Sequence, residues 1–347
     1  MLSVVELWQY LLKTKKPIWL YGMGDGADKI INLLEQYDIK ITGVFASDQF
    51  VRYQNFRGFT VISYAEAKKI SPEMIVLVCF GTSRSEVLEN IDRIAAEQEL
   101  FAPDVPVIGG GYYNLNYAVE HKNELNAVYA RLADEQSKKV FESCLNYRLT
   151  GDINYLKRCE TEPEEAWDSI IKPTDDESFV DLGAFCGDTV EEFLSHVNGY
   201  GHIYAVEPTK KSFNRMAAKI GGMEKVSLFN VAISDKAGEL TFNTHGGRNH
   251  AEAETGEKIK SLSVDEILDG KAATFIKIDI EGGEGAAIDG ARETILRFKP
   301  KMQIAAYHRL EDYFALPLKI FEIRDDYRIY MRRFRSVPAW ETNFYFV

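Results

Sequence analysis

The chain has 347 residues, of which 46% are hydrophobic and 27% charged, enough to form two globular domains with substantial cores. Its 41 basic and 53 acidic side chains give a formal net charge of −12 at pH 7. A field of that sign repels phosphates, which argues against general binding to nucleic acid or to an anionic membrane. The four cysteines have no C-x-x-C spacing, so we do not expect a structural zinc site. Their scattered positions indicate a protein of a reducing compartment. No stretch approaches about 18 apolar residues and no signal-peptide core is visible, which predicts a cytoplasmic protein without a membrane span.

The first predicted domain covers residues 1–111 and alternates strands with helices. An amphipathic helix is expected over residues 2–12, and strands are expected after Pro17 and over residues 39–45 and 74–80. Gly22, Gly24 and Ala27 follow the first strand with the spacing G-x-G-x-x-(G/A), and Asp48 follows the second. This is the glycine fingerprint of a nucleotide-binding βαβ unit. A small Rossmann-like domain is therefore expected.

Two roles stay open for these glycines. They could cradle a dinucleotide or a nucleotide sugar, which would allow a nicotinamide-dependent oxidoreductase, or they could only let a helix pack closely on a strand. The domain also resembles the N-terminal Rossmann-like domain of sugar O-acyltransferases, in its strand, its Gly-x-Gly turn and the run FRGFTV at residues 56–61. That resemblance implies a substrate-presenting role. We favour a scaffold or an interaction surface.

Residues 112–172 show no strand pattern and are predicted to form connecting helices. Asp134 is expected to cap the start of one helix and Gly151 to end it. Tyr147 and Arg148 could reach the mouth of the active site, but we favour a solvated end of that helix. The acidic run at residues 160–165 is expected to be a solvated turn.

Residues 173–347 are predicted to form a doubly wound, mainly parallel sheet. The expected strands cover residues 179–182, 202–206, 225–230, 274–279, 301–306, 327–332 and 342–347, with the last two antiparallel. Ligands bind such sheets at the carboxyl ends of the strands. The polar residues expected to converge there are Asp181, Glu207, Asn230, Asp279, Tyr307 and His308.

The sequence VDLGAFCG at residues 180–187 places a glycine loop between a buried strand and a helix, and resembles motif I of class I S-adenosylmethionine-dependent methyltransferases. It is followed by AVEP (205–208), AISD (232–235), SVDEIL (263–268, with a capping box of Ser263 and Glu266) and KIDIEGGE (277–284). In this order the motifs resemble the FkbM family of methyltransferases, over about residues 125–347. The resemblance implies a class I α/β fold with a seven-stranded sheet and S-adenosylmethionine as cofactor.

The resemblance also implies which residues contact the cofactor. Gly183 and Gly187 should wrap the methionine moiety, and Glu207 should accept hydrogen bonds from the ribose hydroxyls. The full expected set is Asp181, Gly183, Ala184, Gly187, Asp188, Thr189, Glu207, Pro208, Asn230, Val231, Ala232 and Asp279, of which residues 230–232 should flank the adenine.

Lys277, Asp279 and Glu281 alternate along one strand and share a face, so a polar cluster is expected where the strand ends. Removing the proton of an alcohol requires a carboxylate or an imidazole, and such a base contributes roughly 10²- to 10⁴-fold. The catalytic candidates are Asp279, Glu281 and His308, with Glu284 nearby. The alternative is that Lys277 and Glu281 form a structural pair and His308 caps the next helix. The sequence leaves open a divalent metal at Asp279, Glu281 and His308 and does not establish one.

Two further segments have open roles. Residues 243–258, with His245, Arg248 and His250, are expected to form a mobile lid or a solvated loop. A basic patch of Arg328, Arg332, Arg333 and Arg335 is expected either to meet an anionic ligand or to charge a strand edge.

The sequence thus predicts an S-adenosylmethionine-dependent O-methyltransferase acting on a hydroxyl of a sugar, a glycan or another small molecule. The alternatives are the nicotinamide-dependent oxidoreductase and a non-catalytic binding protein on a methyltransferase fold. A nucleic-acid substrate is disfavoured by the charge, and the sequence leaves homo-oligomerisation open.

Overall fold

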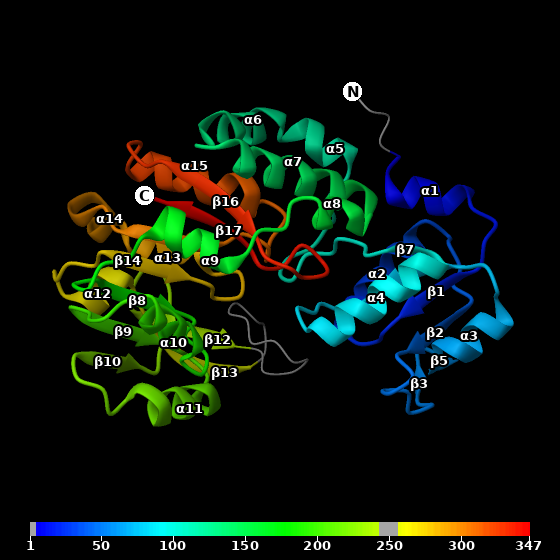
Figure 1. Ribbon diagram of the computed structural model, residues 1–347, viewed down its shortest axis with the longest axis horizontal. Helices are drawn as coiled ribbons and strands as arrows, with labels where there is room; N and C mark the ends of the chain where they lie inside the picture. Colours follow the sequence, from blue (N-terminus) through cyan, green and yellow to red (C-terminus); the bar gives the residue numbers. More distant parts are fainter. Residues whose placement is uncertain (1–4, 243–255) are drawn as a thin grey trace.

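The computed structural model describes residues 5–242 and 256–347 of the chain (Figure 1). It contains two sheets of mainly parallel strands, one from the N-terminal third and one from the C-terminal half. A segment rich in helices joins them and contacts both (Figure 1). Among the described residues, no helix is both long and apolar enough to cross a bilayer.

The sheet of the N-terminal third is formed by β1 (Ile18–Tyr21), β2 (Gly43–Ala46), β5 (Ile62–Ser63), β6 (Ile75–Val78) and β7 (Glu99–Phe101). All of its pairs are parallel, in the order β5-β2-β1-β6-β7. Its other elements are α1 (Leu7–Lys13), α2 (Asp25–Gln36), α3 (Tyr64–Ile70), α4 (Ser85–Glu97) and the hairpin β3 (Asn55–Phe56) and β4 (Phe59–Thr60). The strands β1, β2 and β6 are buried throughout, which explains their uninterrupted apolar runs. The first three residues of the helix expected over 2–12 lie outside the described residues.

The glycine loop after β1 allows close packing of α2 on the sheet. A Cβ added to Gly26 would lie 2.4 Å from the carbonyl oxygen of Cys79, so only glycine fits there. Gly22 and Gly24 have φ angles of 102° and 105°, which L side chains rarely adopt. Asp48 accepts a hydrogen bond from the backbone N–H of Tyr64 (3.1 Å) at the start of α3. These contacts give the loop and Asp48 structural roles.

The connecting segment contains α5 (Leu115–Glu120), α6 (Lys122–Arg131), α7 (Glu135–Thr150), α8 (Ile153–Lys157), α9 (Pro163–Glu165) and the π-helix η1 (Ala166–Ile171). Both expected ends of α7 are found: Asp134 caps it through the N–H of Ser137, and Gly151 ends it with φ of 64°. The expectation of a solvated end is wrong, because Tyr147 and Arg148 are buried. Arg148 Nε lies 2.8 Å from Asp104 Oδ2, a partner 44 positions away that local patterns cannot reveal.

The C-terminal sheet is formed by β8 (Ser178–Leu182), β9 (His202–Val206), β10 (Val226–Phe229), β14 (Phe275–Ile278), β15 (Lys301–Ala305), β16 (Ile329–Arg333) and β17 (Thr342–Phe346). Their order is β10-β9-β8-β14-β15-β17-β16, and β17 is antiparallel to both of its neighbours. The seven expected strands and the antiparallel pair at the end are confirmed. The predicted fold class is therefore correct.

Helices cover both faces of this sheet. On one face, Phe179 and Phe275 pack with η1, α10 (Asp188–Ser195) and α11 (Lys210–Ile220). On the other, Val180 and Ile276 pack with α12 (Val264–Leu268), α13 (Glu284–Gly290), α14 (Arg292–Phe298) and α15 (Asp312–Ile323). Ser263 and Glu266 form the expected capping box of α12.

A small sheet in the order β11-β13-β12 lies beside the large one, formed by β11 (Ala232–Ile233), β12 (Gly238–Phe242) and β13 (Glu257–Leu262). Residues 243–255, which hold His245, Arg248 and His250 of the expected lid, lie outside the described residues.

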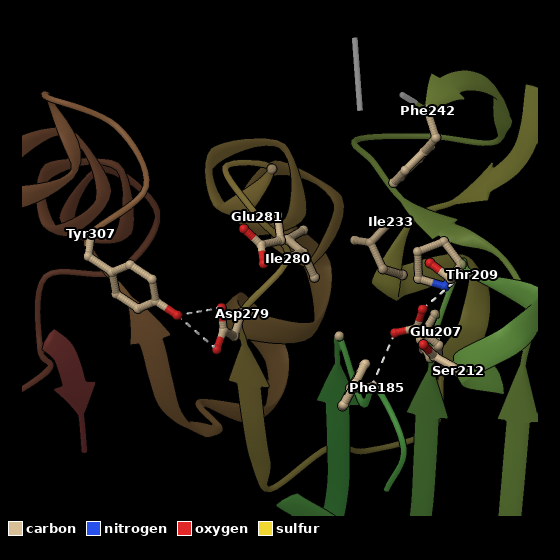
Figure 2. Close-up of a pocket in the computed structure, with 14 residues that line it drawn as sticks. Phe185, Glu207, Thr209, Ser212, Ile233, Phe242, Asp279, Ile280, Glu281 and Tyr307 are labelled. Carbon is tan, nitrogen blue, oxygen red and sulfur yellow. Dashed lines mark hydrogen bonds between the residues drawn. The ribbon is translucent and has the colours of Figure 1, made fainter. Parts of the chain in front are cut away.

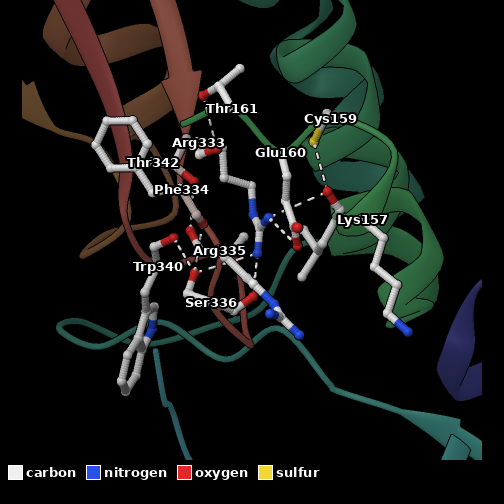
Figure 3. Close-up of polar contacts among 12 residues, drawn as sticks. Lys157, Cys159, Glu160, Thr161, Arg333, Phe334, Arg335, Ser336, Trp340 and Thr342 are labelled. Carbon is white, nitrogen blue, oxygen red and sulfur yellow. Dashed lines mark hydrogen bonds and ion pairs between the residues drawn. The ribbon is translucent and has the colours of Figure 1, made fainter. Parts of the chain in front are cut away.

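Two of the arginines expected in a basic patch are buried and paired, so neither an exposed patch nor a charged strand edge describes them. Arg332 binds Asp134 and Glu165 with N···O distances of 2.7 and 2.6 Å. Arg333 lies 3.4 Å from Glu160 and also donates to backbone oxygens (Figure 3). The acidic run at 160–165 is therefore not a solvated turn: Glu160 and Glu165 are partners of buried arginines, and residues 163–165 form α9.

Candidate active site

The glycine loop after β8 is fixed by its neighbours on both sides. The backbone N–H groups of Gly183 and Ala184 each donate to the carbonyl of Val206 (3.0 Å). A Cβ on Gly183, whose φ is 84°, would lie 1.9 Å from the carbonyl oxygen of Asp279. Gly187 precedes α10 with φ of 82°. The loop can therefore bring its backbone close to a ligand, because it carries glycine where the neighbouring strand is nearest.

Glu207 follows β9 and holds this loop from the other side. Its two carboxylate oxygens accept from the N–H of Phe185 (3.1 Å) and the N–H of Thr209 (2.8 Å). Burial raises the pKa of Glu207, and these backbone donors oppose that shift. Asn230 stands behind Glu207, with its side-chain amide donating to the carbonyls of Glu207 and Pro208 (both 2.9 Å).

A pocket of about 260 Å³ opens at the carboxyl ends of β8, β9 and β14 (Figure 2). One end is lined by Gly183, Phe185, Glu207, Ile233 and Phe242, so it combines a glycine loop and a carboxylate with apolar walls. The other end is lined by Asp279, Glu281, Gly283 and Tyr307 and is acidic. The pocket thus joins two chemically different ends.

Only some of the expected cofactor residues line this pocket among the described residues, namely Gly183, Glu207, Pro208 and Asp279. The others stand behind its wall or in α10: Asp181, Ala184, Gly187, Asp188, Thr189, Asn230, Val231 and Ala232. Sequence reasoning missed the apolar walls Ile233 and Phe242 and the loop residue Phe185. Phe242 ends β12, which follows the AISD motif closely in the chain, and this closeness is the signal that could have indicated it.

Beneath the pocket, Lys277 joins two acids on neighbouring strands. Its Nζ lies 3.6 Å from Asp181 Oδ1 and 3.8 Å from Asp279 Oδ2, and Lys277 and Asp181 are register partners. Burial raises the pKa of the fully buried Asp181 to about 6, against the opposing effect of Lys277. The expected polar cluster is found, with Lys277 paired to Asp181 and Asp279.

His308 lies behind the acidic end of the pocket, with no exposed surface. Its Nδ1 is 3.0 Å from Glu284 Oε1, and its Nε2 is 3.6 Å from oxygens of Asp279 and Glu281. Burial lowers the pKa of His308, but these three carboxylates outweigh it and raise the pKa to about 9. The expectation that His308 caps the next helix is wrong, because the N-cap of α15 is Glu311 and His308 contributes only its backbone N–H, which donates to Asp312 (2.9 Å).

Tyr307 and Glu341 complete the acidic end. The hydroxyl of Tyr307 donates to both oxygens of Asp279 at 3.3 and 3.4 Å (Figure 2). Glu341 comes from the loop between β16 and β17, and both burial and the charge of Asp279 raise its pKa. The sequence pattern gave no sign of Glu341, because it lies more than sixty positions after Asp279 in an irregular loop.

Comparisons with known proteins identify this part of the chain. Residues 181–334 match the family model described as the methyltransferase FkbM domain. The match supports a methyltransferase. The crystal structure of the methyltransferase FkbM from Methylobacillus flagellatus KT has a TM-score of 0.71 at 21% identity, covering 96% of this chain and 90% of that one. This likeness shows that the two chains share a fold. No curated protein sequence matches the chain.

Two solved structures match less well. Precorrin-6y C5,15-methyltransferase from Geobacter metallireducens GS-15 has a TM-score of 0.32 at 13% identity, covering 51% of this chain and 81% of that one. Fibrillarin from Aeropyrum pernix, in complex with S-adenosyl-L-methionine, has a TM-score of 0.36 at 14% identity, covering 53% of this chain and 71% of that one. The resemblance of the N-terminal third to sugar O-acyltransferases stays a prediction.

Proposed function

We propose that this chain transfers a methyl group from S-adenosylmethionine to a hydroxyl oxygen, in the pocket between the Gly183 loop and Asp279. The observation that carries the proposal is that one pocket joins a nucleoside-type end to an acidic end. The match of residues 181–334 to a methyltransferase domain supports the same assignment.

The cofactor fits the end built from the glycine loop. The carboxylate of Glu207 would accept hydrogen bonds from the ribose hydroxyls, as the acid after the second strand does in βαβ nucleotide folds. The methionine moiety would lie along the Gly183 loop, and Ile233 and Phe242 would flank the adenine. Asp279, between the two ends, would face the positively charged sulfonium.

The acceptor would bind at the acidic end. In-line transfer breaks the bond from sulfur to the methyl carbon, forms a bond from that carbon to the acceptor oxygen and releases S-adenosylhomocysteine. The hydroxyl proton passes to a carboxylate, for which Asp279 and Glu281 are placed, with side-chain exposures of 30% and 38%. His308 is fully buried behind them, so we assign it a positioning role in place of a direct base role.

We propose a sugar or glycan as the acceptor class. The acidic end offers two carboxylates and the hydroxyl of Tyr307, which can hydrogen-bond several neighbouring hydroxyls at once. The contacts of Gly26 do not support the oxidoreductase alternative. They show that close packing of α2 on the sheet already accounts for glycine at this position.

Isothermal titration calorimetry with S-adenosylhomocysteine tests the cofactor assignment. We expect binding to the wild-type protein and at least about tenfold weaker binding to Glu207→Gln, because a hydrogen bond to a charged group contributes about 1.5 kcal/mol or more. Glu224→Gln removes an exposed carboxylate of the same domain and should bind like the wild type. If both variants bound S-adenosylhomocysteine with equal affinity, or if the protein bound only NAD, the assignment of the cofactor to this pocket would be wrong.

A further inference from the structure

The position of His308 points to a ligand that the proposed reaction does not by itself require. Like Nδ1, Nε2 of this fully buried ring has no hydrogen-bond partner among the described residues. It faces one oxygen of Asp279 and one of Glu281, each 3.6 Å away. That distance is too long for an N–H···O hydrogen bond, so a proton on Nε2 is left unbonded. When that proton is absent, the lone pair on Nε2 faces two carboxylates, and a cation between the three groups would take the place of the proton.

Glu284 holds the opposite side of the ring. Its Oε1 lies 3.0 Å from His308 Nδ1 and is itself fixed by the N–H groups of Ile280 (2.9 Å) and Gly282 (3.3 Å). A carboxylate behind one ring nitrogen is the usual support of a histidine that ligates a metal through the other nitrogen. The negative charge of Glu284 at this distance favours a proton on Nδ1, which leaves the lone pair on Nε2.

We propose that Asp279, Glu281 and His308 bind one divalent cation, Mg²⁺ or Mn²⁺, at the acidic end of the pocket. Oxygen and imidazole ligands suit these ions, and Glu284 orients the imidazole. Donor atoms about 2.1 Å from a cation lie roughly 3.0 Å apart at right angles and roughly 4.2 Å apart when opposite, and 3.6 Å falls between these values. Glu284 lies close to the same site, because one donor atom each from Asp279, Glu284 and His308 lies within 4.8 Å of the others.

The site is closed on the protein side and open on the pocket side. His308 and Glu284 are buried, whereas Asp279 and Glu281 are partly exposed and line the pocket. Water or an acceptor oxygen can therefore complete the coordination. The cation would hold an acceptor hydroxyl and lower the pKa of that hydroxyl. This role rests on the proposed function, but the existence of the metal site does not.

Manganese binding tests the site directly. Electron paramagnetic resonance of free Mn²⁺ is measured while the purified full-length protein is titrated, followed by competition with Mg²⁺. We expect one Mn²⁺ per chain, with at least tenfold weaker binding to Glu281→Gln, which keeps the shape of a partly exposed side chain. Glu322→Gln, an exposed acid of α15, should bind Mn²⁺ like the wild type. Thermal unfolding of both variants shows that they are folded.

Each outcome has a distinct meaning. Absence of stoichiometric Mn²⁺ binding, or equal binding by Glu281→Gln and Glu322→Gln, overturns the metal site. If Mn²⁺ binds as expected and S-adenosylhomocysteine does not, the metal site stands and the methyl transfer fails. If only S-adenosylhomocysteine binds, the proposed function stands without the cation.

Discussion

Gly183 is the residue at which the cofactor loop comes nearest to β14. Its φ of 84° and the 1.9 Å approach of an added Cβ to a backbone oxygen leave no room for a side chain. We expect Gly183→Ala to lower the free energy of unfolding by about 2 kcal/mol or more, since both backbone strain and a clash are introduced. Urea denaturation measures the change. S-adenosylhomocysteine binding should weaken as well, because the loop must move.

The matched control is Gly222→Ala, where an added Cβ meets no atom within 4 Å. That variant should stay within about 0.5 kcal/mol of the wild type. Equal stabilities of the two variants would show that the Gly183 loop tolerates a side chain.

Glu207 gives the site a pH dependence. Burial raises its pKa above the ordinary glutamate value of 4.5, so it becomes protonated at a higher pH than an exposed glutamate does. Only the charged carboxylate has both oxygens available as acceptors. We therefore expect the affinity for S-adenosylhomocysteine to fall as the pH is lowered from neutral toward this raised pKa. Calorimetry over a pH series should show this decline in the wild type and a smaller one in Glu207→Gln, and parallel curves would contradict it.

At the scale of the elements, one arginine connects β16 to two helices. Arg332 is 2% exposed and binds the N-cap of α7 through Asp134 and the end of α9 through Glu165. We expect Arg332→Met to lower the free energy of unfolding by about 2 kcal/mol or more, because it leaves two half-buried carboxylates without their cation. Arg335→Ala, whose side chain is 51% exposed, should cost at most about 1 kcal/mol. Similar losses for both would mean that the buried pairs contribute little.

The elements themselves were predictable because their signals are local. Apolar runs marked β8, β9 and β14, and Asp134 and Gly151 marked the ends of α7. The site residues that could be predicted, Gly183 and Glu207, follow such strands directly. What could not be predicted depends on distant partners: Arg332 meets residues 167 and 198 positions away, and Glu341 reaches Asp279 from an irregular loop.

At the scale of the molecule, the two sheets share one continuous hydrophobic core. Trp19 and Val76 of the N-terminal sheet belong to the same cluster as Val180 and Ile276 of the C-terminal sheet. The N-terminal third also contacts the loop after β15, since the backbone N–H of Ile108 donates to the carbonyl of His308 (2.9 Å). The N-terminal third is therefore packed against the loop that carries His308 and is not a freely attached domain.

The clearest junction lies where the loop after β6 meets the loop between β16 and β17. Thr82 and Val337 exchange two backbone hydrogen bonds of 2.8 and 3.0 Å, and the ring of Trp340 lies on Gly81. A Cβ on Gly81 would come within 1.7 Å of that ring, so Gly81→Ala must displace Trp340 and, with it, the neighbouring Glu341. We expect this variant to unfold at a lower urea concentration, with a loss of about 1–3 kcal/mol.

Gly110→Ala is the control for this junction, because an added Cβ there meets no atom within 4 Å. It should match the wild type in stability. Both variants should keep the wild-type affinity for S-adenosylhomocysteine, since neither glycine lines the pocket. Methyl transfer by Gly81→Ala should nevertheless be slower, because Trp340 precedes the acid that faces Asp279. If Gly81→Ala matched Gly110→Ala in both stability and rate, the N-terminal third would have no part in holding the active site.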